Sequence, residues 1–338
     1  MEQEVEQYFN DDILLQAATS FQIPFTSLKK LGSFENYVFE GINSHGKEVI
    51  LRLTHSSHRT KEQVESELHW LSYLHNNNAP VSGCLPSING SFVETIKSKD
   101  TAFFVSLFEK AIGRPVKVTD PLFNDTLFNK WGKTIGRFHR LTVNYTRPDF
   151  ITKRPDLVVE YDKQFAPFLP KNQKLLSKVN EVLQAVKQLP KSSIRYGLIH
   201  SDVHSGNFFY DEATDKITVF DFDDCSYHHF ISDIAIPLYY SSWLKCDNQQ
   251  DRNHFGHKFL MHFLKGYQTE RSVHLESLNE ISLFLKLRDC ELYGVFHKKW
   301  DLDHLNDQQK KLLNEIYQRI MNDQPLVQLN LEKIIHSL

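Results

Sequence analysis

The segment from residue 197 to 224 constrains this chain most, because acidic and amide residues follow short apolar stretches at regular intervals. Asn207 stands five positions after Asp202, in a polar stretch that follows an apolar one. A second apolar stretch, residues 217–220, leads into three neighbouring carboxylates, those of Asp221, Asp223 and Asp224. This pattern predicts a strand, a loop and a β-hairpin with oxygen-bearing side chains gathered at strand ends.

These side chains suit a hard cation. Mg²⁺ prefers carboxylate and amide oxygens and commonly keeps phosphates as further ligands, and clustered carboxylates repel one another unless a cation or a proton is present. The spacing of Asp202 and Asn207 is that of the protein-kinase catalytic loop, and Asp221-Phe222-Asp223 lies where such enzymes carry Asp-Phe-Gly. We therefore expect phosphoryl transfer, with Asp202, Asn207 and Asp221 meeting at one magnesium–triphosphate in a groove between two lobes.

The first hundred residues predict an antiparallel sheet and one main helix. Apolar alternation and turn residues place three strands at Leu28–Gly32, Tyr37–Ile42 and Glu48–Leu53. Two more strands are expected at Ile88–Val93 and Thr101–Phe108. Thr60 and Gln63 form a capping-box pattern, which predicts that a helix starts there. Helical spacing places Glu67 on the inward side with Val64 and Leu71, so this carboxylate needs a buried partner.

The rest of the chain is mostly helical. Apolar residues recur at helical spacing from Leu127 to Phe138, from Leu175 to Val186 and in a long pattern from Leu275 to Phe296. A β-rich island at 196–222 interrupts this part. We predict an α+β protein with an N-terminal lobe at 1–108, a hinge at 109–113 and a C-terminal lobe at 114–338.

Composition excludes several classes of protein. The net charge is −3 and no long basic run occurs, which disfavours a nucleic-acid partner. No stretch is apolar enough to predict a membrane span, and the polar N-terminus lacks a signal-peptide pattern. Four scattered cysteines without a CxxC pair fit a reducing compartment, so we expect a cytoplasmic protein.

The motifs resemble those of the aminoglycoside phosphotransferase and choline kinase-like family. The most specific match is the stretch LIHSDVHSGNFF followed by ITVFDFDD and SDIA. Weaker matches cover a nucleotide loop in LGSFENYVFE, a third strand in EVILRL and an N-lobe helix in VESELHWLSYL. A hinge in FFVSLFEKAIGRPV and a first C-lobe helix in WGKTIGRFHRL are also similar. The resemblance implies a two-lobed protein kinase-like fold with a five-stranded N-lobe sheet and a small β-hairpin region carrying the active site.

The resemblance also implies roles for single residues. Asp202 would be the catalytic carboxylate facing the acceptor hydroxyl, and Asn207, Asp221 and Asp223 would hold Mg²⁺. Arg52 would bind the phosphates of ATP or GTP, and Glu67 would orient Arg52. The backbone of Glu109 and Ala111, in the hinge, would contact the adenine. Asp233 would support the C-terminal lobe.

This sequence departs from the family pattern at three positions. Arg52 stands where lysine is frequent and Ser201 where glycine is usual, in a loop that needs an unusual φ. The nucleotide loop has a single glycine, Gly32. None of these changes removes a group that the chemistry requires.

Several alternatives stay open at this point. A protein Ser/Thr kinase would need a long activation loop, yet Asp233 follows Asp224 by only nine positions. A glycosyltransferase could use Asp221 and Asp223 as its metal motif, but that leaves Asp202 and Asn207 unexplained. A catalytically silent binding protein is a weaker alternative, because the set of ionisable residues is complete. A zinc site at His200 and His204 is also weaker, since His200 fits a buried structural role better.

The acceptor is the least constrained part. The resemblance implies a family that phosphorylates aminoglycosides and amino or sugar alcohols, so we expect a small hydroxylated acceptor, neutral or cationic. Asp224, Asp289 and Glu291 are candidates to face its positive charge. Tyr239, Tyr240 and Trp243 fit packing of the C-terminal lobe better than an aromatic cage.

Overall fold

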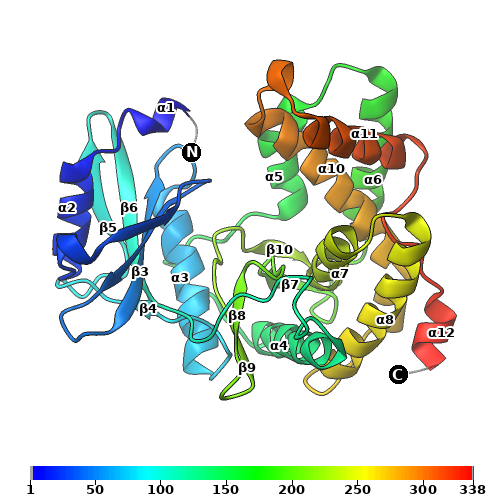
Figure 1. The fold of residues 1–338 in the computed structure, drawn as a ribbon, viewed down its shortest axis with the longest axis horizontal. Coiled ribbons are helices and arrows are strands. Elements are labelled where there is room, and N and C mark those ends of the chain that lie inside the picture. The colour runs from blue at the N-terminus through cyan, green and yellow to red at the C-terminus, as the bar shows by residue number, and fades with distance from the viewer. Residues whose placement is uncertain (1–2, 337) are drawn as a thin grey trace. The chain divides into compact units, whose positions relative to one another are not determined.

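The computed structural model describes residues 3–336 and 338, and its contacts divide the chain into two compact units (Figure 1). The first comprises the residues up to Gly113 together with Tyr145–Arg154 and Thr218–Asp223. The second comprises Arg114–Asn144, Pro155–Ile217 and Asp224–Leu338. Asp221 and Asp223 therefore pack with the N-terminal sheet unit, although the chain reaches them only after a long helical stretch.

The first unit is built on one antiparallel sheet of six strands in the order β1-β2-β3-β6-β4, with β5 paired to β6. The strands are β1 (Lys29–Gly32), β2 (Tyr37–Ile42), β3 (Glu48–His55), β4 (Cys84–Leu85), β5 (Glu94–Ser98) and β6 (Thr101–Glu109). The helices are α1 (Gln3–Glu6), α2 (Asp11–Ser20), the 3₁₀ turn η1 (Phe25–Ser27) and α3 (Lys61–Asn76). The first three predicted strands and the Thr60 start of the helix are confirmed, and both bonds of the capping box are present.

The sheet has a helix on each face. Ile13 and Leu14 of α2 belong to one buried cluster with Leu51 and Leu53 of β3. Arg52 lies between these two leucines and points to the other face, since side chains alternate along a strand, and there it meets α3. Asn10 caps α2 by accepting a hydrogen bond from the Ile13 N–H. This N-terminal helix is absent from the expectations above.

The predicted strand at Ile88–Val93 is wrong. The chain turns there, and β5 begins only at Glu94. The Ser87 hydroxyl accepts hydrogen bonds from the N–H groups of Asn89 and Ser91, and Gly90 takes a φ of +76°. This turn leaves Ile88 exposed. A two-residue strand, β4, is present as well, so the sheet has six strands where five were predicted.

The second unit is mainly helical. Its α-helices are α4 (Asp125–Val143), α5 (Leu157–Gln164), α6 (Gln173–Lys187), α7 (Ser232–Lys245), α8 (Gln249–Tyr267), α9 (Leu275–Asn279), α10 (Ile281–Lys299), α11 (Asp307–Met321) and α12 (Leu331–His336). Two 3₁₀ turns, η2 (Ala166–Phe168) and η3 (Leu302–His304), complete them. The long pattern predicted from Leu275 to Phe296 is broken at Glu280 into α9 and α10.

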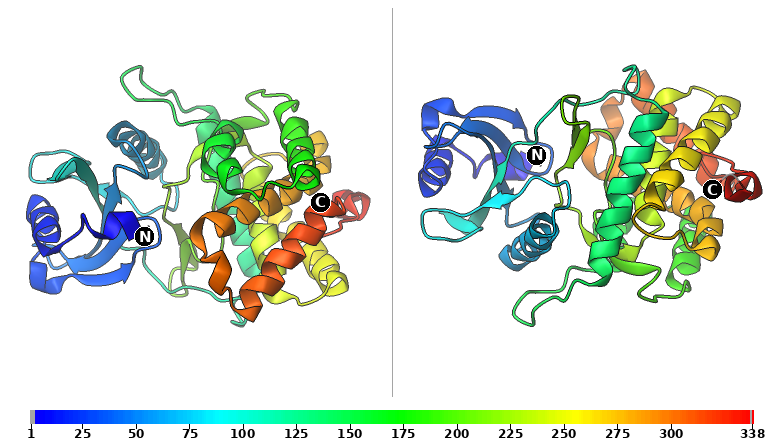
Figure 2. Two further views of the ribbon diagram at one scale, coloured as in Figure 1. Left: turned by 90° about the horizontal axis from the view of Figure 1, so that it is seen from above. Right: turned by 90° about the horizontal axis from the view of Figure 1, so that it is seen from below.

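Helices α4 and α8 lie side by side in both views of Figure 2. Glycines permit this close approach. A Cβ atom at Gly132 of α4 would lie 1.8 Å from the Phe263 carbonyl oxygen, and one at Gly266 of α8 would lie 1.7 Å from the Asn129 carbonyl oxygen. Larger residues at these two positions would force the helices apart.

Short strands carry the candidate site. β7 (Tyr196–Ile199) pairs with β10 (Ser226–His229), a strand that the sequence analysis missed. β8 (Phe208–Asp211) and β9 (Lys216–Val219) form a hairpin, and the chain enters the first unit within β9. No helix among the described residues is long and apolar enough to cross a membrane.

Candidate active site

The loop after β7 places Asp202 and Asn207 together. The Asn207 side-chain amide donates to the Asp202 backbone carbonyl at 2.8 Å and to Asp202 Oδ2 at 3.2 Å. Because Nδ2 is used in this way, the carbonyl oxygen Oδ1 of Asn207 is the atom that can hold a cation. The loop thus brings together two of the predicted site residues in the second unit.

Asp233, at the start of α7, anchors this loop through hydrogen bonds to its backbone. Its fully buried carboxylate accepts from the backbone N–H groups of His200 (3.0 Å) and Ser201 (2.8 Å), and His139 Nε2 lies 3.3 Å away. Ser201 adopts a φ of +70°, the unusual conformation expected where a glycine is usual. His200 is fully buried and accepts from the Asp202 N–H through Nδ1, which fits its predicted structural role. These contacts fix the backbone that carries Asp202.

Asp202 stays ionised at neutral pH. Burial acts to raise its pKa, but a hydrogen bond with His204 and the positive charge of Arg288 outweigh burial and hold the pKa below its ordinary value. Arg288 NH2 lies 2.6 Å from Oδ1 and His204 Nε2 lies 3.4 Å from Oδ2. The side chain is 20% exposed, so the carboxylate is within reach of a ligand.

The first unit holds Arg52 and Glu67 as a buried, two-pronged ion pair. Arg52 NH1 and NH2 lie 2.8 and 2.7 Å from the two carboxylate oxygens of Glu67, which is fully buried as its helical position predicted. A third nitrogen, Arg52 Nε, is buried and has no partner among the described residues. A phosphate oxygen of a nucleotide would fit this donor.

Replacing Arg52 with lysine tests this pair. Lysine keeps the charge but cannot make both hydrogen bonds to Glu67, so we expect Arg52→Lys to lower the free energy of unfolding by about 1.5–3 kcal/mol. Urea unfolding measures the change. The matched control is Lys29→Ala, which removes an exposed ion pair with Glu40 and should leave stability nearly unchanged. Equal effects of the two substitutions would contradict the importance of the buried pair.

Asp221 follows β9 at an unusual backbone position. The Val219 backbone anchors the strand in the first unit by bonding Pro80 and Ser82, and Phe222 is buried against Trp70 of α3. Between these anchors Asp221 is exposed and has a φ of +64°. Aspartate tolerates this conformation better than most residues, and such strain is typical of functional sites. An exposed carboxylate held this way can ligate a cation.

Asp223 is instead enclosed by other side chains. Asn36 and His58 lie 3.1 and 2.7 Å from Oδ2, and Arg59 Nε lies 3.3 Å from Oδ1. Burial acts to raise the pKa of Asp223, but Arg59 and His58 more than offset burial and hold the pKa well below the ordinary value. Asp223 therefore ties the nucleotide loop and the β3–α3 connection together, and its predicted contact with a metal stays a prediction.

Asp223 is also part of a group of three side chains whose spacing could hold a metal ion. Ligand atoms of Glu35, His58 and Asp223 lie within 4.8 Å of one another. The positive charge of Arg59 on the same carboxylate opposes a cation here. Mg²⁺ prefers carboxylate and amide oxygens, and the predicted contacts of Asn207 and Asp221 with this metal stay a prediction.

The hinge residues have their own contacts. The Glu109 N–H donates to the Gly83 carbonyl at 2.9 Å, and its side chain lies 3.6 Å from His75. Ala111 is buried. The predicted adenine contacts of these two residues stay a prediction.

Comparisons with known proteins identify the family of this chain. A family model described as "Phosphotransferase enzyme family" matches residues 27–277. The chain belongs to this phosphotransferase family. Amicoumacin kinase of Bacillus subtilis (strain 168) is 32% identical over 330 residues, which is 97% of each chain. The protein is accordingly a small-molecule phosphotransferase, and the glycosyltransferase and protein-kinase alternatives are set aside.

Solved structures extend the similarity. An amicoumacin kinase in complex with AMP-PNP, Ca²⁺ and Ami is 33% identical, and the match covers 99% of this chain and 100% of that one with a TM-score of 0.93. A microcompartment-associated aminopropanol kinase, 21% identical, matches over 93% of this chain and 98% of that one with a TM-score of 0.75. The kinase-like fold is therefore confirmed.

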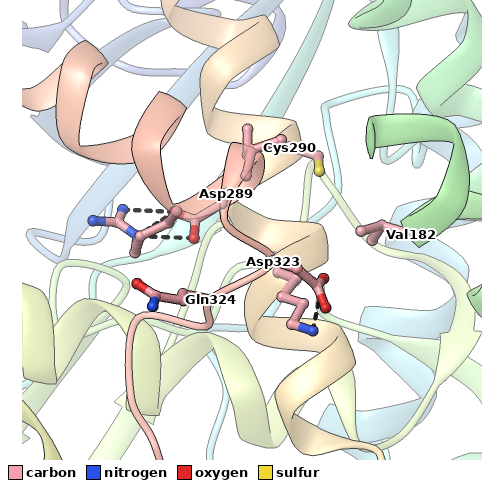
Figure 3. Close-up of a pocket in the computed structure, with 8 residues that line it drawn as sticks. Val182, Asp289, Cys290, Asp323 and Gln324 are labelled. Carbon is pink, nitrogen blue, oxygen red and sulfur yellow. Dashed lines mark hydrogen bonds and ion pairs between the residues drawn. The ribbon is translucent and has the colours of Figure 1, made fainter. Parts of the chain in front are cut away.

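Two residues expected to face a cationic acceptor do not fit that role in this phosphotransferase. Asp289 is 1% exposed and is bound by the Arg319 guanidinium and the Tyr239 hydroxyl. It lines a cavity with about 10 Å³ of space, at most enough for one water molecule (Figure 3). Glu291 is 4% exposed and paired with Arg288 at 3.0 Å. A buried carboxylate must be paired with a cation inside the protein, so neither Asp289 nor Glu291 is left to bind a ligand.

The aromatic residues of α7 pack as expected. Tyr239 is buried, and its ring contacts those of Tyr240 and Trp243. Arg288, in contrast, was missed by the sequence analysis. It lies 86 positions from Asp202, and nothing in the local pattern of α10 marks it.

Proposed function

We propose that this phosphotransferase moves the γ-phosphate of ATP to a hydroxyl group of amicoumacin, or of a similar hydroxylated small molecule, with Mg²⁺ bound to the nucleotide. The 32% identity to an amicoumacin kinase along nearly the whole chain supports the acceptor. GTP remains the alternative nucleotide. The observation that carries the proposal is the ionised Asp202 carboxylate, held by Asn207 and by a buried backbone support.

Each residue has one part in this reaction. The acceptor hydroxyl oxygen forms a bond to the γ-phosphorus while the bond to the ADP oxygen breaks, and Asp202 orients the hydroxyl and takes its proton. Arg52, oriented by Glu67, binds the phosphates through its free Nε. Asn207 Oδ1 and Asp221 would hold Mg²⁺, which neutralises charge on the phosphates. The backbone of Glu109 and Ala111 would bind the adenine.

A transfer assay tests the proposal. Purified protein is incubated with ATP, Mg²⁺ and amicoumacin, and ADP release and the phosphorylated product are measured by coupled assay and mass spectrometry. We expect product only when all three are present. Removing the metal with EDTA should abolish transfer, and excess Mg²⁺ should restore it.

The same assay includes 1-amino-2-propanol as a second acceptor. If this compound is phosphorylated and amicoumacin is not, the reaction type holds and the proposed acceptor is wrong. If ATP is bound but neither compound increases ADP release above the rate without acceptor, the proposed substrate class is wrong. Transfer at an unchanged rate in EDTA would contradict the metal requirement.

A further inference from the structure

Arg288 of α10 contacts the carboxylate that the proposed function uses as its base. Its NH2 group lies 2.6 Å from Asp202 Oδ1. We infer that Arg288 is a positioning residue, which fixes the orientation of Asp202 for catalysis and is itself held in place by Glu291 and Tyr240. This inference rests on the proposed role of Asp202.

Both oxygens of Asp202 are restrained, but by different parts of the second unit. Asn207 and His204, from the same loop, lie near Oδ2. Among the described residues, Arg288 is the hydrogen-bond partner that reaches Oδ1 from outside the loop. The terminal torsion of an aspartate side chain is broad, so a contact on one oxygen alone leaves the carboxylate plane free to turn. Proton acceptance needs one lone pair directed at the acceptor hydroxyl, and Arg288 supplies the second restraint.

Arg288 is held more firmly than an ordinary surface arginine. NH1 lies 3.0 Å from Glu291 one turn along α10, and NH2 donates to the Tyr240 hydroxyl of α7 at 2.7 Å. The guanidinium carbon lies 5.2 Å from the centre of the Tyr240 ring. The Tyr240 ring in turn packs on His204, with ring centres 4.9 Å apart. The contacts with Glu291, Tyr240 and Asp202 use two nitrogens of one rigid fork, which a guanidinium offers and a single ammonium group does not.

Glu291 explains how the arginine can be kept in this place. Its side chain is 6% exposed, and burial raises the pKa of this carboxyl. A buried carboxylate is stable only when it is paired, so Glu291 and Arg288 depend on each other. Arg288 thus bridges two carboxylates, the buried Glu291 and the more exposed Asp202. The pairing with Glu291 holds the cation beside Asp202 whether or not a substrate is bound.

The experiment separates positioning from stability by using two variants. Arg288→Met leaves Glu291 buried without a partner, so we expect lower stability in urea and a kcat for amicoumacin phosphorylation reduced about 10- to 100-fold. The affinity for ATP, measured by calorimetry, should stay near the wild-type value. Arg288→Met with Glu291→Met removes the unpaired charge, so stability should recover while kcat stays low. Recovery of kcat together with stability would overturn the inference.

A matched ion pair between α10 and α11 serves as the control. Arg319 and Asp289 form a second buried ion pair, but neither contacts Asp202. Arg319→Met should lower stability in the same way, and Arg319→Met with Asp289→Leu should restore it, both with an unchanged kcat in the folded protein. A loss of kcat in these controls equal to that of Arg288→Met would also overturn the inference.

Chemical rescue gives an independent measurement. Added guanidinium at low millimolar concentration should partly restore kcat in the Arg288→Met/Glu291→Met variant but not in a variant of Asp202. If guanidinium does not raise kcat of the Arg288→Met/Glu291→Met variant and Arg288→Lys keeps the wild-type kcat, a guanidinium beside Asp202 is not required. That result would overturn the inference. If the wild-type protein does not phosphorylate amicoumacin, the proposed acceptor fails, and the slow hydrolysis of ATP by water then reports on Arg288 in the same variants.

Discussion

Replacing Asp202 with asparagine is expected to reduce kcat for phosphoryl transfer by about 10²- to 10⁴-fold, the usual contribution of a positioned acid or base. Asparagine keeps the size of the side chain and one oxygen atom, but it cannot accept the hydroxyl proton. Calorimetry should show nearly unchanged affinity for ATP, because the groups proposed to bind the nucleotide are Arg52, Asn207 and Asp221.

The control for this substitution is Asp247→Asn, the same chemical change at an exposed position of the second unit. It should leave both kcat and stability unchanged. Urea unfolding of Asp202→Asn shows whether any loss of activity comes from unfolding, since the amide also loses its charge pair with Arg288. Transfer at close to the wild-type rate in the folded variant would remove Asp202 from the reaction.

Much of the site follows from local spacing. The interval between Asp202 and Asn207 predicted two side chains near one another, and the structure places them in contact. The spacing of Glu67 from its apolar neighbours predicted an inward-facing carboxylate with a partner, and Arg52 is that partner. Such inferences succeed because a loop of six residues or a turn of helix leaves few alternative geometries.

Contacts between distant segments had no comparable signal. Arg288 meets Asp202 across 86 positions, and His58 meets Asp223 across 165. A charged residue on a helix usually lies in solvent, so neither α10 nor the β3–α3 connection distinguishes these residues from surface charges. Their roles depend on how helices and strands pack, which periodicity within one element does not reveal.

The error at Ile88–Val93 has a different cause. The three apolar residues of this stretch, at positions 88, 92 and 93, are compatible with a short strand and with a turn that leaves an apolar side chain exposed. Asn89 and Gly90 were the turn signal, and Gly90 adopts the positive φ that this dipeptide favours. The turn residues therefore decided the structure, and the adjacent β4 is too short to show any periodicity.

The histidine at position 228 is expected to make the protein strongly acid-sensitive. His228 is fully buried on β10, and neither ring nitrogen has a hydrogen-bond partner among the described residues. Burial, and then the neighbouring His229, lower the pKa of His228 to about 3. Asp156 and Asp233 act to raise the pKa and Lys191 acts to lower it further, but burial dominates. The folded protein therefore keeps this side chain neutral.

The sign of the effect follows from proton uptake. The unfolded chain protonates His228 below its ordinary pKa of 6.5, while the folded chain does so only near 3. Because the unfolded state binds more protons in this interval, the stabilising contribution is fully present above pH 6.5 and is lost as the pH falls. At 1.36 kcal/mol per pKa unit the loss is about 2 kcal/mol at pH 5 and approaches about 4–5 kcal/mol at pH 3.

Urea unfolding between pH 7.5 and pH 5 measures this loss, with His228→Leu as the decisive variant. Leucine has a similar volume, fits beside Phe284 and cannot take up a proton, so the variant should lose about 2 kcal/mol less than the wild type over this range. His45→Gln, at an exposed turn, is the control and should leave the pH dependence unchanged. His139 and His229, whose pKa values burial also lowers, keep part of the acid sensitivity in His228→Leu. An identical pH dependence in wild type and His228→Leu would mean that the buried ring is protonated in the folded state, which its apolar surroundings oppose.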